Sequence, residues 1–422
     1  MKRYSSFVVG AVALAVLTAC SDDKPTGPAG QEAFTRFVAM GTSLTMGVQS
    51  DGVVYFSQQQ DWTKLLAHQA FASFTQPLIA APGCFSPLIA PLQLSRRMSG
   101  ISAGANPAAS VPDTACAALG TYTLPTNDVG IDGANSYDAL YITPESAAVE
   151  TVKRRRQYRL VLPPRKSQVT AMMQQNPTLV SVELGANEVL GVTTGLLLPA
   201  AAYRTPFTYV PNTVWQPVYQ RVVDSVKTTG AKAILVSVPN VSSIVSFRAG
   251  DELWLNRAEF ANFGVVINAN CQGSTNLIFV PLKVSTAVAT AQATGTAQNL
   301  SCADAPGTQD QILTPADVTT ITAVVSGMNS YIQSQASTNG WAFLDLNTVL
   351  AKAVANRGPY SVAKQLGCVR PYGQYISLDG VHPNVQGYQE MANAAAIALN
   401  QTYGFAIPEN PQAELTPAQV CP

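Results

Sequence analysis

The chain has 422 residues, of which 47% are hydrophobic and only 12% are charged. Such a chain can bury a sizeable core, in one large domain or in two smaller ones. Its 25 basic residues balance its 25 acidic residues, and this lack of a basic excess argues against a nucleic-acid partner.

The first residues are typical of a bacterial lipoprotein signal. A short basic start precedes an apolar stretch from Phe7 to Leu17, which is too short to span a bilayer as a mature helix. The sequence Leu-Thr-Ala-Cys then ends at Cys20 and resembles a lipobox, in which cleavage exposes the cysteine for lipidation. We expect a signal peptide over 1–19 and a lipid such as palmitate on Cys20, with a flexible tether over 20–33. An ordinary signal peptide with an incidental cysteine is the alternative.

Acyl chains on Cys20 would hold the protein on a membrane. We therefore expect a lipid-anchored monomer in the cell envelope of a Gram-negative-type bacterium, in its outer membrane. The sequence leaves open whether the protein faces the periplasm or the cell surface.

Six cysteines remain after Cys20, an even number that favours disulfides in an exported chain. No Cys-x-x-Cys pair occurs, which argues against a zinc ribbon or a thioredoxin motif, and we expect no metal. Pairing of nearest neighbours is favoured because each bond would close one loop-rich segment. The expected pairs are Cys84–Cys116, Cys271–Cys302 and Cys368–Cys421.

Apolar runs and amphipathic segments alternate along the rest of the chain. In chain order, we expect a strand over 34–40, helices over 61–71 and 167–175, a strand over 178–184, a helix through 218–226, a strand over 233–238, a helix from Thr314, a strand over 341–346 and a helix over 383–399. Ser167 and Thr314 are suitable N-caps, and Pro315 suits a first helical position. Strands that alternate with helices predict an α/β fold with a mostly parallel sheet covered on both sides.

Two segments fit neither pattern. Residues 76–126 are rich in Pro, Ala, Ser and Gly, and residues 240–313 are equally hard to assign. We expect both to be long, loop-rich insertions in one domain over 34–405, followed by a tail over 406–422. Ligands of such sheets bind at the carboxyl ends of the strands, so the residues just after each strand are the informative ones.

Ser43 lies just beyond the glycine that ends the first predicted strand, in Gly41-Thr42-Ser43-Leu44. It could project at the sheet edge, at the start of a helix whose N–H groups stabilise negative charge. A helix cap is the simpler interpretation of this segment taken alone. Asn187 follows the second predicted strand, where it offers an amide donor for an oxyanion or serves as an ordinary turn residue.

Asp379-Gly380-Val381-His382-Pro383 places a carboxylate three residues before a histidine. On a compact turn, Asp379 could orient His382, as the partner of the base does in a catalytic triad. A surface turn and a metal-ligand pair are the alternatives, but no cluster of His or Cys supports a metal. The chain has only two histidines, and the other, His68, lies within a predicted helix. A mechanism that uses serine and histidine would therefore depend on His382.

Four segments resemble, in order, the sequence blocks of the SGNH (GDSL-like) hydrolase family. The family blocks are Gly-Asp-Ser-Leu, a glycine-containing block, Gly-x-Asn-Asp and Asp-x-x-His-Pro, and the similar segments here are 41–44, 128–134, 185–188 and 379–383. The resemblance implies a three-layer α/β/α, flavodoxin-like fold and a serine esterase that needs no cofactor. Its substrate would be a small-molecule, lipid or glycan ester, so that the enzyme is a lipase, an esterase or a glycan O-deacetylase.

The resemblance also implies roles for single residues. Ser43 would attack the ester carbonyl, His382 would accept and return its proton, and Asp379 would support His382. The backbone N–H groups of Ser43 and Gly133 and the side-chain amide of Asn187 would form the oxyanion hole.

Two residues depart from the family pattern, because Thr42 and Glu188 stand where the blocks usually have aspartates. Neither is the nucleophile, the base or an oxyanion donor, so both would lie in the shell that supports the site. These departures motivate an alternative function, a surface lipoprotein that keeps the SGNH fold and binds a glycan or lipid without catalysis.

Overall fold

The computed structural model describes residues 29–94, 96–100, 116–149 and 156–421. The expected signal peptide, the lipidation site Cys20 and the tether as far as residue 28 lie outside these ranges. The last part of the expected tether, Gln31 to Ala33, already belongs to the 3-10 helix η1 (Gln31–Arg36). Within the described ranges, no helix is both long enough and apolar enough to cross a membrane.

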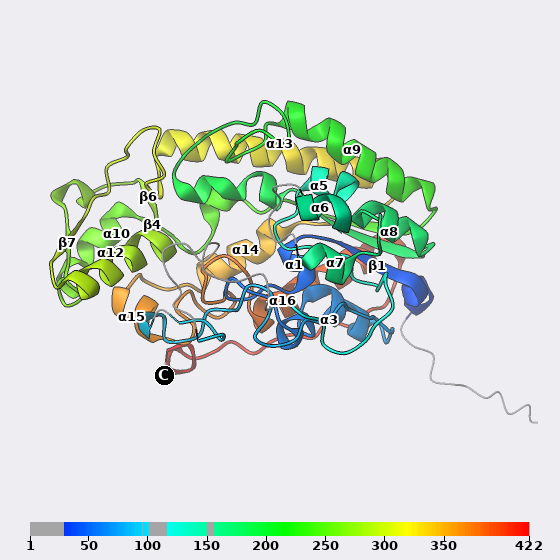
Figure 1. The fold of residues 1–422 in the computed structure, drawn as a ribbon, viewed down its shortest axis with the longest axis horizontal. Helices are drawn as coiled ribbons and strands as arrows, with labels where there is room; N and C mark the ends of the chain where they lie inside the picture. Colours follow the sequence, from blue (N-terminus) through cyan, green and yellow to red (C-terminus); the bar gives the residue numbers. More distant parts are fainter. Residues whose placement is uncertain (1–28, 95, 101–115, 150–155, 422) are drawn as a thin grey trace, which may run out of the picture.

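A four-stranded parallel β-sheet lies in the half of the molecule that carries the label β1 in Figure 1. Its strands follow the order β1 (Phe37–Gly41), β2 (Leu179–Glu183), β3 (Lys232–Val236) and β9 (Ala342–Leu344). The expected mixed α/β fold with a parallel sheet is therefore confirmed. The segment 127–131 runs beside β1 on the side away from β2, where Asp128 pairs in parallel with Ala39.

The first strand is shorter than the predicted range 34–40. It begins at Phe37, because the preceding residues turn in η1. Phe34 is buried there and packs edge-on against Phe37, with 5.3 Å between the ring centroids. The apolar character of Phe34 thus reflects packing under the sheet and not membership of the strand.

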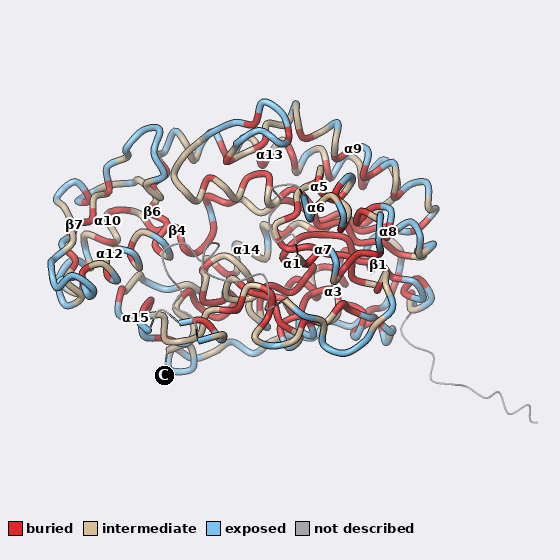
Figure 2. Tube along the Cα trace, viewed as in Figure 1, coloured by how far each residue is buried: buried red, intermediate tan, exposed pale blue. Residues whose placement is uncertain are grey.

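Every residue of β1 and β2 is buried. Successive residues of a strand point to opposite sides, so both faces of the sheet are buried. In β1, Val38 and Met40 join one hydrophobic cluster, whereas Phe37 and Ala39 join another. Figure 2 shows the sheet region as mostly buried. The first cluster includes side chains of α5 (Ser136–Tyr141), α8 (Gln168–Gln174), α9 (Asn212–Thr228) and α13 (Pro315–Asn339), and the second includes those of α3 (Trp62–Gln69) and α16 (Val385–Tyr403).

Capping side chains explain where several helices begin. Ser167 and Thr314 each accept a hydrogen bond from the backbone N–H three residues further on, which confirms both predicted N-caps. The helix predicted over 383–399 is α16, which starts at Val385 and not at Pro383. The side chain of Asn384 caps it by accepting two backbone N–H bonds, so Pro383 belongs to the preceding loop.

Further helical segments of the described chain are mostly one or two turns long. They are α1 (Ser43–Met46), α2 (Tyr55–Gln58), α6 (Pro144–Val149), α7 (Gln157–Val161), η4 (Ala186–Glu188), η5 (Leu190–Thr194), η6 (Val241–Ser243), α14 (Leu346–Ala355), α15 (Val362–Gly367) and α17 (Pro417–Val420).

The cysteines pair as nearest neighbours, as expected. The disulfides are Cys84–Cys116, Cys271–Cys302 and Cys368–Cys421. The first of them lies within residues 76–126, called the excursion below. The described part of the excursion is irregular, as predicted, with the short 3-10 helix η2 (Leu92–Leu94) and isolated bridges such as the one between Leu88 and Arg97.

The prediction that residues 240–313 form a second loop-rich insertion is wrong. They form a unit with regular elements at the end of the molecule away from α8 (Figure 1). These elements are β4 (Phe247–Ala249), α10 (Gly250–Leu255), α11 (Arg257–Ala261), β5 (Val265–Ile267), η7 (Ala269–Cys271), β6 (Leu277–Phe279), α12 (Val280–Thr294), β7 (Gln298–Leu300) and β8 (Ile312–Leu313).

The reason for this error is the weak pattern of the segment. Its strands have two or three residues, which is too short to display a period of two. In α12, the buried Val284 and Val288 stand among Ala and Thr residues that give little contrast between the two sides of the helix. The unit nevertheless packs around a hydrophobic cluster to which both valines belong and to which buried residues between 353 and 376 also contribute.

Candidate active site

Ser43 is the first residue of α1, directly beyond the carboxyl end of β1. It is 7% exposed, and its Oγ lies 3.0 Å from Nε2 of His382. The N-cap of α1 is Thr42, which makes no side-chain capping bond. The helix-cap interpretation of Ser43 is therefore wrong.

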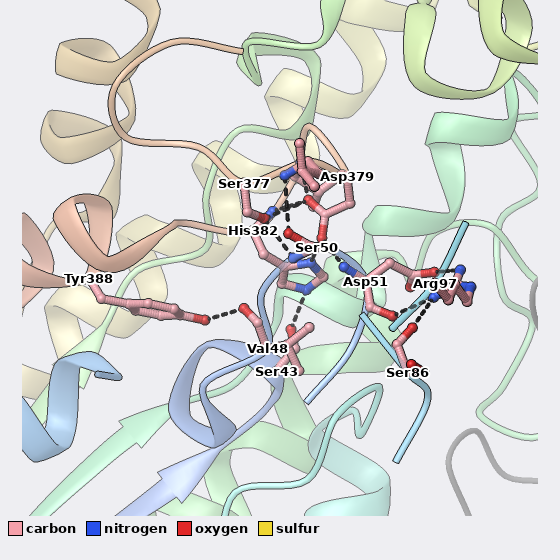
Figure 3. Close-up of polar contacts among 12 residues, drawn as sticks. Ser43, Val48, Ser50, Asp51, Ser86, Arg97, Ser377, Asp379, His382 and Tyr388 are labelled. Carbon is pink, nitrogen blue, oxygen red and sulfur yellow. Dashed lines mark hydrogen bonds and ion pairs between the residues drawn. The ribbon is translucent and has the colours of Figure 1, made fainter. Parts of the chain in front are cut away.

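His382 and Asp379 come from the loop that precedes α16. Nδ1 of His382 lies 2.8 Å from Oδ2 of Asp379, and the two side chains are 12% and 9% exposed. The loop is compact, because the N–H of Ser377 donates to the carbonyl of His382 at 2.9 Å. Figure 3 shows Ser43, His382 and Asp379 as one hydrogen-bonded chain of side chains. The structure thus brings the three residues predicted for a catalytic triad into contact.

Several donors hold the carboxylate of Asp379. The backbone N–H groups of Val381 and His382 each donate to Oδ1 at 2.8 Å, and the N–H of Asp51 donates to Oδ2 at 2.5 Å. Ser377 adds its hydroxyl at 3.2 Å from Oδ1. Burial raises the pKa of Asp379, but the charge of His382 and the hydrogen bonds from His382 and Val381 outweigh burial and lower it below 3.8. Asp379 is therefore ionised at neutral pH.

The same pair sets the charge of the imidazole. Burial lowers the pKa of His382, but the charge of Asp379 and its hydrogen bond raise it above 6.5. A neutral imidazole that donates Nδ1–H to Asp379 has its Nε2 lone pair directed at the Ser43 hydroxyl. A serine, a base and a partner that orients the base are the parts of a nucleophilic mechanism.

The candidate oxyanion residues lie on segments that end at the same edge of the sheet. The N–H of Ile131 donates to the carbonyl of Gly41 at 3.1 Å, and Gly133 follows in a turn with φ 78°. Asn187 lies in η4, just beyond β2, and its Nδ2 donates to the carbonyl of Ala134 at 2.8 Å. The structure thus joins Asn187 to the segment that carries Gly133, beside the strand that leads to Ser43.

Glu183, at the carboxyl end of β2, was not predicted as a site residue. Its carboxyl group bonds both the N–H and the hydroxyl of Thr42, each at 2.8 Å, and both corresponding groups of Thr45 at 3.3 and 3.1 Å. Position 42 is a threonine where the resembled sequence blocks usually have an aspartate. A carboxyl group from the adjacent strand instead bonds the start of α1. Burial raises the pKa of Glu183 to about 7, against the opposing effect of these bonds. A lone acid in a mostly apolar strand was the available signal.

Glu188, the other departure from the family blocks, contacts the start of α5. It is fully buried and accepts hydrogen bonds from the N–H of Ser136 at 2.8 Å and the hydroxyl of Tyr203 at 3.0 Å. Burial raises its pKa above 4.5. Glu188 therefore supports the scaffold next to Asn187.

Asp51, which contacts Asp379, was also not predicted, because Ser50-Asp51-Gly52 is ordinary turn sequence. His68 is exposed near the end of α3, as its helical position suggested. Among the residues that the structure describes, no group of three or more His, Cys, Asp or Glu side chains could hold a metal ion.

Comparison with models of known protein families and with curated proteins finds no match to this chain. The assignment of a function therefore rests on the geometry of the site.

Proposed function

We propose that this protein is a serine esterase of the SGNH type, which hydrolyses carboxylic esters. One observation carries the proposal: Ser43, His382 and Asp379 form a nearly buried hydrogen-bonded chain, although Ser43 and His382 are 339 positions apart in the sequence. A capping serine or a surface turn has no need of such an arrangement. The burial of both faces of the sheet supports the three-layer α/β/α fold that belongs to this proposal.

The proposed reaction proceeds through an acyl-enzyme. The Ser43 oxygen bonds to the ester carbonyl carbon while Nε2 of His382 accepts the hydroxyl proton, and Asp379 stabilises the resulting imidazolium. The tetrahedral intermediate then collapses, and His382 gives the proton to the leaving alcohol. Water, activated by the neutral His382, attacks the acyl-enzyme in the second half of the reaction and releases the carboxylic acid and the free Ser43 hydroxyl.

The developing negative charge on the carbonyl oxygen requires hydrogen-bond donors. We assign this role to the N–H groups of Ser43 and Gly133 and to the side-chain amide of Asn187. One amide hydrogen of Asn187 is directed at Ala134, which orients the group and leaves the second hydrogen for the oxyanion. Removal of one such donor typically costs about 3–4 kcal/mol of transition-state stabilisation.

Ester hydrolysis can be tested with the purified chain without residues 1–20. Short p-nitrophenyl esters should be hydrolysed by the wild type, and Ser43→Ala should lose at least about 1,000-fold in kcat, because the nucleophile is removed. Equal turnover by both proteins would overturn the proposal. Binding of a glycan or lipid without Ser43-dependent turnover would instead favour the non-catalytic lipoprotein. Lipid, glycan and small-molecule esters remain the candidate substrates.

We further propose that the protein is exported and anchored by lipid on Cys20 in the outer membrane. The disulfide pairing of the other six cysteines supports an oxidising compartment. Cys20→Ser should fail to incorporate a palmitate analogue and should leave the membrane fraction, whereas incorporation by the variant would contradict the lipid anchor.

A further inference from the structure

The turn at Ser50 and Asp51 has an unusual backbone. Both residues have φ 56°, in the left-handed region of backbone conformations that residues other than glycine rarely adopt. The flanking residues Gln49 and Gly52 close the turn with two backbone hydrogen bonds of 2.9 and 3.1 Å. Such a conformation persists only where its surroundings hold it. The contacts of this turn therefore identify the residues that keep it in place.

The turn contacts the loop that carries Asp379 at three points. The N–H of Asp51 donates to Oδ2 of Asp379 at 2.5 Å, which is the oxygen that also bonds His382. The N–H of Ser50 donates to the hydroxyl of Ser377 at 2.8 Å, and the N–H of Leu378 donates to the hydroxyl of Ser50 at 3.3 Å. The left-handed turn therefore aims a backbone donor at the carboxylate that orients the imidazole.

Arg97, from the excursion, holds this turn from the other side (Figure 3). Its Nη2 lies 2.5 Å from Oδ2 of Asp51, and its Nη1 donates to the carbonyl of Asp51 at 3.2 Å. Nη1 also donates to the carbonyl of Ser86 at 2.7 Å, and the guanidinium lies 4.8 Å from the ring centroid of Phe85. The arginine thus joins the excursion to the backbone of Asp51.

The burial of Arg97 makes this contact specific. The side chain is only 1% exposed, whereas that of Asp51 is 26% exposed. A buried cation is costly unless it is paired and hydrogen-bonded, and the planar guanidinium can bond the carboxylate and the carbonyl of Asp51 at once. A lysine has the same charge but lacks the planar group that makes both bonds at once.

We propose that Arg97 is a positioning residue for catalysis: by fixing the Ser50–Asp51 turn, it holds Asp379 in the orientation that directs His382 toward Ser43. This inference rests on the proposed function. It assigns to the excursion a part in the catalytic geometry, because the residue that holds the turn belongs to the segment closed by Cys84–Cys116.

The charges around His382 provide a readout that a purely structural role would not move. The carboxylates that favour its protonated form are Asp379 on its own loop, Asp132 and Asp51. Tyr372 also faces Asp379. Loss of the Arg97 cation should therefore raise the pKa of His382, and loss of the Asp51 carboxylate should lower it.

The test compares Arg97→Gln with Arg96→Gln in the purified full chain. Arg96 is the neighbouring arginine and is exposed, so it controls for the loss of one positive charge on the excursion. Arg97→Gln should lower kcat by about 10-fold or more, because it disturbs the orientation of the base His382. KM should change by less than about twofold, because Arg97 itself lies away from the substrate. The pKa on the acidic side of the kcat/KM profile should rise, and Arg96→Gln should match the wild type in all three quantities.

Asp51→Asn provides a second arm if Arg97→Gln does not fold. It should also lower kcat, but with a shift of the His382 pKa in the opposite direction. The chain has two histidines, so the titration of His382 can be followed by NMR after assignment with a His68→Gln variant, without any need for turnover. If the wild type shows no Ser43-dependent turnover, the proposed function fails, and the NMR titration still tests the coupling of Arg97 to His382. Folded Arg97→Gln or Asp51→Asn with a wild-type pKa of His382 would overturn the inference.

Discussion

At the scale of single residues, the charge of His382 sets the lower pH limit of the proposed reaction. Its imidazole must be neutral to accept the Ser43 proton, and its pKa is raised above 6.5 by Asp379 against the effect of burial. The kcat/KM profile should therefore rise with pH through a pKa above 6.5. Steady-state kinetics across this range provide the measurement, and a profile that is flat from pH 5 upward would contradict the assignment.

Asp379→Asn is the matched variant for this profile. The amide keeps the size of the side chain but removes the charge that raises the pKa of His382, so the profile should shift to lower pH. The maximal kcat should fall by about 10,000-fold, because the amide favours the wrong tautomer of the imidazole. A variant with wild-type kcat would show that Asp379 does not orient the base.

Glu183 is expected to make stability depend on pH. Its pKa of about 7 in the folded protein exceeds its usual value of 4.5, so the folded state keeps a proton that the unfolded chain releases. The contribution of Glu183 to stability is thus fully present below pH 4.5 and is lost as the pH rises toward 7. A shift of this size corresponds to about 3 kcal/mol of unfolding free energy.

The measurement is urea unfolding of the wild type and Glu183→Gln at pH 4.5 and pH 7. The wild type should lose about 3 kcal/mol more than the variant between these pH values. Glu32→Gln, a change at an exposed glutamate, should keep the wild-type dependence. If the free energy of unfolding changes equally with pH in the wild type and in Glu183→Gln, Glu183 does not remain protonated in the folded protein.

At the scale of elements, the 240–313 unit contacts the loop that carries Asp379 and His382. Gly380 has φ 75°, and a Cβ there would lie 2.8 Å from Cβ of Ser246 and 2.9 Å from Cγ of Pro281. Gly380→Ala should therefore displace the loop and lower kcat by about 100-fold. Gly358→Ala is the matched control, because Gly358 has φ 65° and no atom within 4 Å of the added Cβ. If both variants lose the same activity, backbone strain and not the contact with the 240–313 unit would be the cause.

The elements that the sequence predicts well are those with strong local signals. The sheet strands have buried apolar runs, and the helices at Ser167 and Thr314 have N-caps, so both were found within a few residues. The 240–313 unit was missed because its stability comes from a cluster of residues distant in sequence, which no local period reveals. Phe34 shows the opposite error, since an apolar residue extends a strand pattern although it packs beneath the sheet.

The candidate site shows the same division between local and tertiary signals. Ser43, Asp379 and His382 could be predicted because each lies in a short motif beside a predicted element. Glu183 and Arg97 could not, because their importance arises from partners 141 and 46 positions away. A buried acid in a strand and an arginine in an irregular segment acquire meaning only when the fold brings their partners to them.

At the scale of the whole molecule, three segments distant in sequence meet at one edge of the parallel sheet. The strand β1 leads to Ser43, β2 leads to Asn187, and the loop before α16 carries His382. Tyr388 of α16 donates its hydroxyl to the carbonyl of Val48 at 2.7 Å, which joins the segment after α1 to the helix after His382 (Figure 3). The site is therefore a product of the complete fold, and fragments of the chain should lack it.

The central claim, that Ser43 is an activated nucleophile, is tested most directly by covalent labelling. The purified wild type is treated with a fluorophosphonate, which forms a stable adduct with an activated serine, and the modified peptide is identified by mass spectrometry. One adduct on the peptide that contains Ser43 is expected, together with its loss in Ser43→Ala and a much slower reaction in His382→Ala. Absence of labelling in folded wild type, or labelling that persists in Ser43→Ala, would contradict the claim.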